Sequence, residues 1–129
     1  KAGLYLIPEW AAREGTDKSF YGSGDAIVTG DSIVVNYTVP ATKTLYISAF
    51  DFAASANAVA DADKNQVAWF RIVDTTTGDV FTYLGGNGGG QKSFPKPIVI
   101  PAEHQVAIRL FNQAGHVLDL RFTAQGYEV

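Results

Sequence analysis

Residues 66–84, QVAWFRIVDTTTGDVFTYL, decide the fold class of this sequence. In the first half of the stretch, side chains alternate between two faces, and the alternation predicts a strand that buries Phe70 and Ile72. The segment TGD at 77–79 is typical of a tight turn, and the residues after it are again β-branched and aromatic. The stretch therefore predicts a β-hairpin.

Strand patterns of the same kind recur along the rest of the chain, with turn residues between them. They cover residues 32–39, 43–52, 97–100, 105–111 and 117–123. About eight short strand candidates at this spacing predict an all-β fold, a single antiparallel β-sandwich of jelly-roll or Greek-key type.

The alternation also predicts which side chains face the core. In residues 43–52 it places Leu45, Ile47 and Ala49 on one face of the strand, and Phe50 and Phe52 on the other. The residues that we expect in the core are Val35, Tyr37, Leu45, Ile47, Phe70, Ile72, Ile108, Leu110, Leu118, Leu120 and Phe122.

Two stretches share one pattern. Residues 39–47, VPATKTLYI, recur in outline as residues 100–108, IPAEHQVAI. A proline just after a strand ends the ladder of hydrogen bonds and lets the chain cross over. The pattern suits a sandwich built from two Greek-key halves, although any strand–turn–strand unit can look like this.

The remaining connections are expected to be loops. Residues 112–116 predict a hairpin loop, and residues 53–63 predict a long loop with a helical turn. The glycine-rich residues 85–93 predict a surface loop that is mobile or orders against a partner. They approach a phosphate-binding loop, but Gln91 replaces the required glycine and two prolines follow where a helix must begin, so nucleotide binding is not expected.

Residues 1–24 are expected to form an N-terminal arm, and residues 25–129 the sandwich domain. Large apolar side chains are unusual at a terminus unless something ties it down. We therefore expect those of the arm to pack on a neighbouring subunit or a host lattice, with the glycines of residues 15–24 supplying flexible reach. The alternative is that part of the arm is an edge strand. The candidate partner-binding residues are Leu4, Tyr5, Leu6, Ile7 and Trp10.

Composition excludes several classes of function. The absence of cysteine excludes disulfide scaffolds, thiolate zinc sites and cysteine nucleophiles. A net charge of −3 argues against nucleic acid as a partner. No apolar run approaches the roughly 20 residues of a membrane-spanning helix, so no membrane partner is expected.

No catalytic, metal or cofactor site is predicted. Residues 61–65, DADKN, begin like a calcium loop, but Gln66 and Ile72 stand where an EF-hand needs glycine and glutamate. A different calcium site that includes Asp51 remains the alternative. The two histidines, His104 and His116, are far from any recognisable zinc or nucleophile motif, so we expect a protein that is not an enzyme.

Aromatic residues make up 12% of the chain and offer an alternative function. Such side chains stack on sugar rings in carbohydrate-binding sandwiches, although more often they fill a core or an interface. The candidate glycan platform is Trp10, Tyr21, Trp69 and Tyr83.

Residues 39–47 and the closing residues 122–129, FTAQGYEV, resemble small β-sandwich virion proteins of tailed bacteriophages, of the head decoration (cement) type. The resemblance covers about a fifth of the chain and carries over no site residues. It implies a jelly-roll-like fold, self-association as a homotrimer, and attachment to a lattice of major capsid protein through the N-terminal arm. The leading hypothesis is therefore a non-enzymatic structural protein on the capsid surface of a virion. The alternative is a secreted or cell-surface module that binds carbohydrate or a receptor.

Overall fold

The structure, a computed structural model, describes residues 15–129. Eight β-strands make up about two thirds of this part of the chain, which also has one short 3-10 helix, η2 (Val59–Asp61). The strands are β1 (Thr16–Ile27), β2 (Ser32–Thr38), β3 (Leu45–Ala56), β4 (Val67–Asp74), β5 (Asp79–Asn87), β6 (Gly89–Ile100), β7 (Gln105–Asn112) and β8 (Leu118–Glu128).

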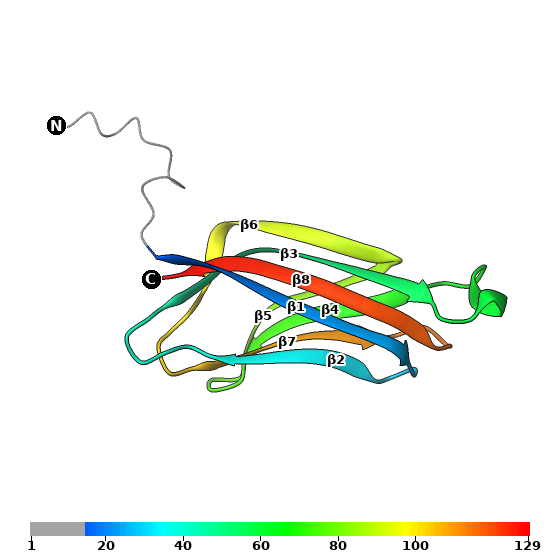
Figure 1. Ribbon diagram of the computed structural model, residues 1–129, viewed down its shortest axis with the longest axis horizontal. Helices are drawn as coiled ribbons and strands as arrows, with labels where there is room; N and C mark the ends of the chain where they lie inside the picture. The colour runs from blue at the N-terminus through cyan, green and yellow to red at the C-terminus, as the bar shows by residue number, and fades with distance from the viewer. Residues whose placement is uncertain (1–14) are drawn as a thin grey trace, which may run out of the picture.

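The strands form two antiparallel four-stranded sheets that pack face to face (Figure 1). Sheet A has the strand order β1-β8-β3-β6, and sheet B has the order β2-β7-β4-β5. Strands pair first with last along the chain: β1 with β8, β2 with β7, β3 with β6, and β4 with β5. The chain is thus one long hairpin rolled into a sandwich, which is the jelly-roll arrangement. The predicted all-β sandwich is confirmed.

The tip of this long hairpin is the β4–β5 turn, where the sequence predicts it. Every other connection crosses from one sheet to the other. The two proline-containing stretches, 39–47 and 100–108, are both such crossovers. They also bind each other, because the N–H of Val39 donates to the carbonyl of His104 at 3.0 Å and the N–H of Glu103 donates to that of Val39 at 2.8 Å.

An aromatic cluster occupies the middle of the core. Phe70 of β4 stacks on Phe50 of β3, with ring centroids 4.1 Å apart, and also contacts Phe52 and Phe122. Nine of the eleven expected core residues are buried. Val35 and Tyr37, on the edge strand β2, are half-buried and pack against the core from its side.

Strand β3 departs from the predicted alternation. A β-bulge between Ile47 and Ala49 adds one residue relative to both neighbouring strands. The extra residue shifts the phase of the pleat, so that Phe50 and Phe52 point into the core on the same face as Ile47. The expectation that these phenylalanines lie opposite Ile47 is wrong for this reason.

Two predicted loops are also corrected. The glycine-rich residues 85–93 belong to β5 and β6 and turn tightly at Gly88, whose φ of 83° is readily adopted by glycine. Residues 113–116 connect sheet B to sheet A and form no hairpin loop, because β7 pairs with β2 and β4 while β8 pairs with β1 and β3. The buried Asn112 organises this crossover through its side-chain hydrogen bonds to Ile27, Ala114 and His116.

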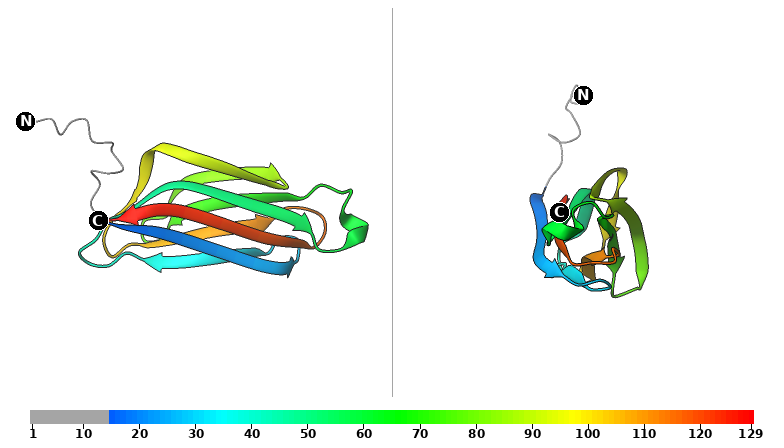
Figure 2. Two further views of the ribbon diagram at one scale, coloured as in Figure 1. Left: turned by 45° about the horizontal axis from the view of Figure 1, so that its top comes forward. Right: turned by 90° about the vertical axis from the view of Figure 1, so that its right-hand side faces the viewer.

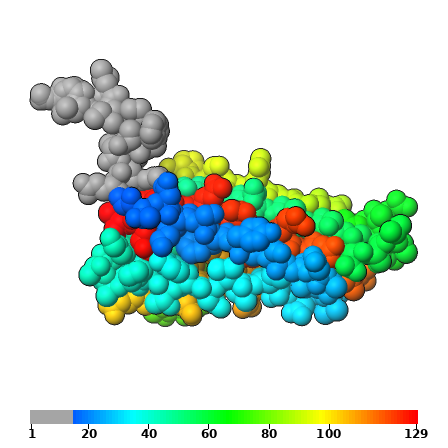
Figure 3. Space-filling view, viewed as in Figure 1, coloured from blue at the N-terminus to red at the C-terminus, as the bar shows by residue number. Residues whose placement is uncertain are grey.

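The expected boundary of the arm is wrong as well. Residues 16–24 belong to β1, which pairs with β8 along its length and buries Phe20. Figure 3 shows β1 (blue) running between β8 (red) and β2 (cyan). The proposed partner-binding residues Leu4, Tyr5, Leu6, Ile7 and Trp10 lie outside the described residues.

The first and last described residues meet at one end of the sandwich (Figure 2). There Gly15 lies against Glu128 and Val129, and Thr44 and Val129 exchange two backbone hydrogen bonds. The β2–β3, β4–β5 and β6–β7 connections lie at this end too. Residues 1–14 are therefore joined to the domain here. No helix in the described part of the chain is long and apolar enough to span a membrane.

Candidate functional site

The structure separates the residues of the predicted glycan platform. Tyr21 is 62% exposed on β1 and lies on the outer face of sheet A. Trp69 and Tyr83 are also exposed, but they lie on the outer face of sheet B. Because the two sheets pack through their inner faces, Tyr21 is on the opposite surface of the molecule. Trp10 lies outside the described residues, so only Trp69 and Tyr83 are brought together.

Trp69 and Tyr83 form a corner of two perpendicular rings. Their centroids are 4.8 Å apart and their planes meet at 88°. Trp69 pairs with Gly85 on β5, where an added Cβ would lie 2.6 Å from Cε2 of the indole. The indole therefore lies across the backbone of β5 in the space that glycine leaves. Covering an edge-strand glycine in this way also stabilises the sheet.

Two arginines and a phenylalanine adjoin this corner. Arg71 of β4 lies directly opposite Arg109 of β7, and Trp69 lies directly opposite Phe111. The Cζ atoms of the two arginines are 5.1 Å and 5.5 Å from the ring centroid of Phe111, within the range of cation–π attraction. We call Trp69, Arg71, Tyr83, Arg109 and Phe111 the arginine–aromatic face.

Arg71, Arg109 and Phe111 were not among the residues predicted from the sequence, although part of the signal was there. Trp69 and Arg71 are two residues apart in one predicted strand, and Arg109 and Phe111 are two apart in another. Each pair therefore points to one side of its strand. What the sequence does not give is that β4 and β7 are neighbours, because they are more than thirty residues apart in the chain.

The outer face of sheet A has a shallow hollow of about 430 Å³. One row of side chains crosses all four strands beneath it, from Tyr21 through Thr123 and Asp51 to Gln91, and Arg121 adjoins the row. The lining carries one carboxylate and one guanidinium, so its formal charge is balanced. Glycoside hydrolysis uses two carboxylates, and this hollow has one.

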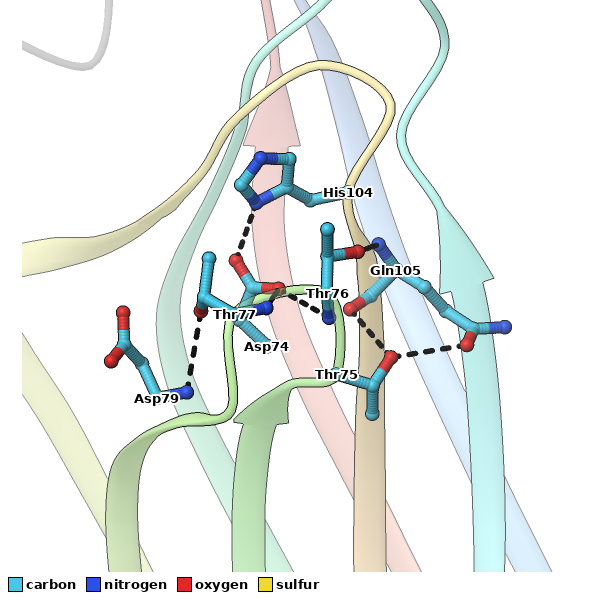
Figure 4. Close-up of polar contacts among 7 residues, drawn as sticks. All are labelled: Asp74, Thr75, Thr76, Thr77, Asp79, His104 and Gln105. Carbon is cyan, nitrogen blue, oxygen red and sulfur yellow. Dashed lines mark hydrogen bonds and ion pairs between the residues drawn. The ribbon is translucent and has the colours of Figure 1, made fainter.

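A polar cluster ties the β4–β5 turn to the β6–β7 connection (Figure 4). Asp74 is 1% exposed. Its Oδ1 accepts hydrogen bonds from the backbone N–H groups of Thr76 and Thr77 at 2.9 Å and 3.2 Å, and its Oδ2 lies 2.7 Å from Nδ1 of His104. Burial by itself would raise the pKa of Asp74. The hydrogen bonds from His104, Thr77 and Thr76 outweigh it and hold the pKa below its ordinary value.

The hydroxyl groups in this cluster are engaged in fixing the two connections. Oγ1 of Thr75 donates to the carbonyl of Gln105 at 3.0 Å, and Oγ1 of Thr76 accepts from the N–H of Gln105 at 2.9 Å. Oγ1 of Thr77 accepts from the N–H of Asp79 at 3.3 Å. Among the described residues, no hydroxyl pairs with His104 as a nucleophile would. The cluster acts as a structural clamp.

The candidate calcium residues are likewise accounted for. Nζ of Lys64 lies 2.8 Å from Oδ1 of the half-buried Asp61, and this contact lowers the pKa of the Asp61 carboxyl. Asp51 lies on the outer face of sheet A, and Nε2 of His116 lies 3.1 Å from the side-chain oxygen of Gln66. Within residues 15–129, no three His, Cys, Asp or Glu side chains are grouped so that they could hold a metal ion.

Comparison with known proteins adds no family to this description. No protein-family model matches the sequence, and no curated protein matches it.

Proposed function

We propose that this chain is a non-enzymatic structural protein of a virion, which binds to a capsid lattice and to copies of itself as a decoration protein. The eight-stranded jelly roll supports the proposal, because capsid proteins of viruses use this arrangement. Lectin domains and cupins use it as well, so the fold alone does not select the function.

The observation that carries the proposal is that residues 16–129 already supply a filled core. Side chains from both sheets close it, among them Leu45, Ile72, Ile108 and Leu118, each 0% exposed. Positions 4–10 add five large apolar side chains, which lie outside the described residues. Leaving such side chains in water forgoes about 1.5–3 kcal/mol each relative to burial. In the proposal they are buried against a neighbouring subunit or the lattice.

The experiment compares three proteins: the full chain, residues 15–129, and the full chain with Leu4, Leu6 and Ile7 each replaced by serine. Circular dichroism and thermal unfolding report folding, and sedimentation equilibrium reports assembly. We expect all three to fold with similar melting temperatures, and only the unmodified chain to self-associate.

Two results would contradict the proposal. If residues 15–129 fail to fold while the serine variant is also destabilised, the N-terminal segment is a part of the core. If both variants fold and assemble like the full chain, the interface lies elsewhere.

A second candidate function is a carbohydrate- or receptor-binding module. The arginine–aromatic face favours it, because two exposed rings and two half-buried guanidinium groups gather on one sheet face there.

A further inference from the structure

The arginine–aromatic face carries uncompensated positive charge on a protein whose net charge is −3. Arg71 and Arg109 lie directly opposite each other on neighbouring strands. Like charges in such a cross-strand pair are destabilising. The four strands of sheet B contain two carboxylates: Asp74, which is buried, and Asp79, which is exposed at the start of β5 beside the β4–β5 turn.

Neither guanidinium is engaged by another group of the described chain except through the ring of Phe111. No ion pair or hydrogen bond within residues 15–129 involves the side chain of Arg71 or Arg109, and Nε of Arg71 is buried without a hydrogen-bond partner. Proteins keep a destabilising arrangement of this kind, here two like charges on neighbouring strands, mainly where function requires it. An anion bound at the two guanidiniums would supply the missing partner.

The aromatic corner beside the arginines presents a flat apolar surface. Trp69 packs across Gly85 and remains 37% exposed, while Tyr83 stands perpendicular to it and is 53% exposed. The C–H face of a sugar ring is apolar and suits such a surface, and the corner between the rings restricts its orientation. A simple anion would make no use of these rings.

We propose that the arginine–aromatic face binds an acidic saccharide, whose sugar ring stacks on Trp69 against Tyr83 and whose carboxylate or sulfate group binds Arg71 and Arg109. The planar guanidinium has donors in a fork that matches either anion. This inference deepens the second candidate function and does not depend on residues 1–14.

The test is isothermal titration calorimetry of the full chain at low ionic strength with four probes: trigalacturonate, a chondroitin sulfate tetrasaccharide, neutral galactotriose and inorganic sulfate. We expect at least one acidic oligosaccharide to bind about tenfold or more tightly than galactotriose and sulfate, and its affinity to fall as salt is added. Binding of trigalacturonate would show that a carboxylate suffices. Binding of the chondroitin sulfate tetrasaccharide alone would point to its sulfate groups, because that probe carries carboxylates as well.

Variants locate the site. We expect Arg71→Gln, Arg109→Gln and Trp69→Ala each to weaken binding of the acidic probe about tenfold or more. The matched controls lie on sheet A: Arg121→Gln and Tyr21→Ala remove an exposed arginine and an exposed tyrosine, and should leave affinity unchanged. Circular dichroism checks that each variant is folded. If Trp69→Ala does not fold, the two glutamine variants still test the site.

Several results would overturn the proposal. One is an affinity for inorganic sulfate equal to that for the acidic oligosaccharide, and another is no binding of either acidic oligosaccharide. The others are loss of binding in the sheet A controls and retention of binding in both glutamine variants. Tight binding of a hexaglutamate peptide in place of the saccharides would identify the face as a site for acidic protein. The serine variant of the N-terminal segment should keep its affinity for the oligosaccharide, so this proposal and the virion proposal can fail separately.

Discussion

Replacing Asp74 by alanine should destabilise the domain strongly at neutral pH and much less in acid. The substitution removes an almost fully buried carboxylate and leaves three donors without their acceptor: the N–H groups of Thr76 and Thr77, and Nδ1 of His104. A hydrogen bond to a charged group contributes about 1.5–3 kcal/mol, and a buried donor that loses its partner costs about 1–3 kcal/mol. Because His104 is partly exposed, water can replace some of the loss, and we expect a total of about 2–4 kcal/mol.

The pH dependence follows from the lowered pKa of Asp74. Its pKa in the folded protein is below the ordinary value of about 3.9, so the unfolded chain takes up the proton first as the pH falls. The stabilisation from the carboxylate is therefore present above about pH 4 and is lost as the pH falls through the folded pKa. The difference in unfolding free energy between the natural chain and Asp74→Ala should be largest at pH 6 and smaller at pH 3.

Urea unfolding followed by tryptophan fluorescence measures this difference at both pH values. If the unfolding free energy falls with urea concentration at the same slope in both proteins, the two proteins expose similar surface on unfolding. His104→Ala and the double variant complete a cycle that isolates the coupling of Asp74 to His104. A loss below about 0.5 kcal/mol at pH 6, well under the value of the hydrogen bonds removed, would refute the reasoning. So would a difference that stays constant between pH 6 and pH 3.

Three further predictions concern the core, the β3 bulge and metal ions. Ile47→Ala, at a residue that is 0% exposed, should lower the unfolding free energy by about 2–5 kcal/mol, and a loss below about 1 kcal/mol would contradict its inward placement. Gly126→Ala would place a Cβ against the carbonyl oxygen of Tyr46 and should cost about 1–3 kcal/mol, whereas Gly115→Ala, with no atom nearby, serves as the control; equal stability of the two variants would argue against the bulge geometry. A chelator should leave the melting temperature unchanged, and a large fall would indicate a calcium site near residues 61–65, because a bound ion stabilises the folded state.

Much of the fold could be predicted from local patterns. Alternation in β4 gave the inward placement of Phe70 and Ile72, and the turn residues before β5 gave the one true hairpin of the long rolled ribbon. These features depend on residues close together in the chain, where the period of two applies directly.

The errors arose where long-range pairing overrides the local pattern. The bulge after Ile47 is defined against two partner strands, so the inward turn of Phe50 could not be deduced from β3 alone. Glycines that look like a loop instead occupy strands, since a Cβ at Gly90 would meet the ring of Phe52 and one at Gly85 would meet Trp69. The composition indicates flexibility, but the structure uses these glycines for close packing.

The candidate site was predictable only in pieces. Tyr21, Trp69 and Tyr83 were identified by residue type, yet their division between two opposite faces depends on the sheet order. That Arg71 and Arg109 lie opposite each other can be recognised only once β4 and β7 are known to pair.

The most direct test of the proposed assembly is the mass of the unmodified chain in solution, measured by native mass spectrometry over a range of concentrations. The resemblance to decoration proteins implies a homotrimer, so we expect a species of three chains of 13.8 kDa each. That species should disappear when Leu4, Leu6 and Ile7 are replaced by serine. A monomer at every concentration, or a trimer that persists in the serine variant, would contradict the proposal.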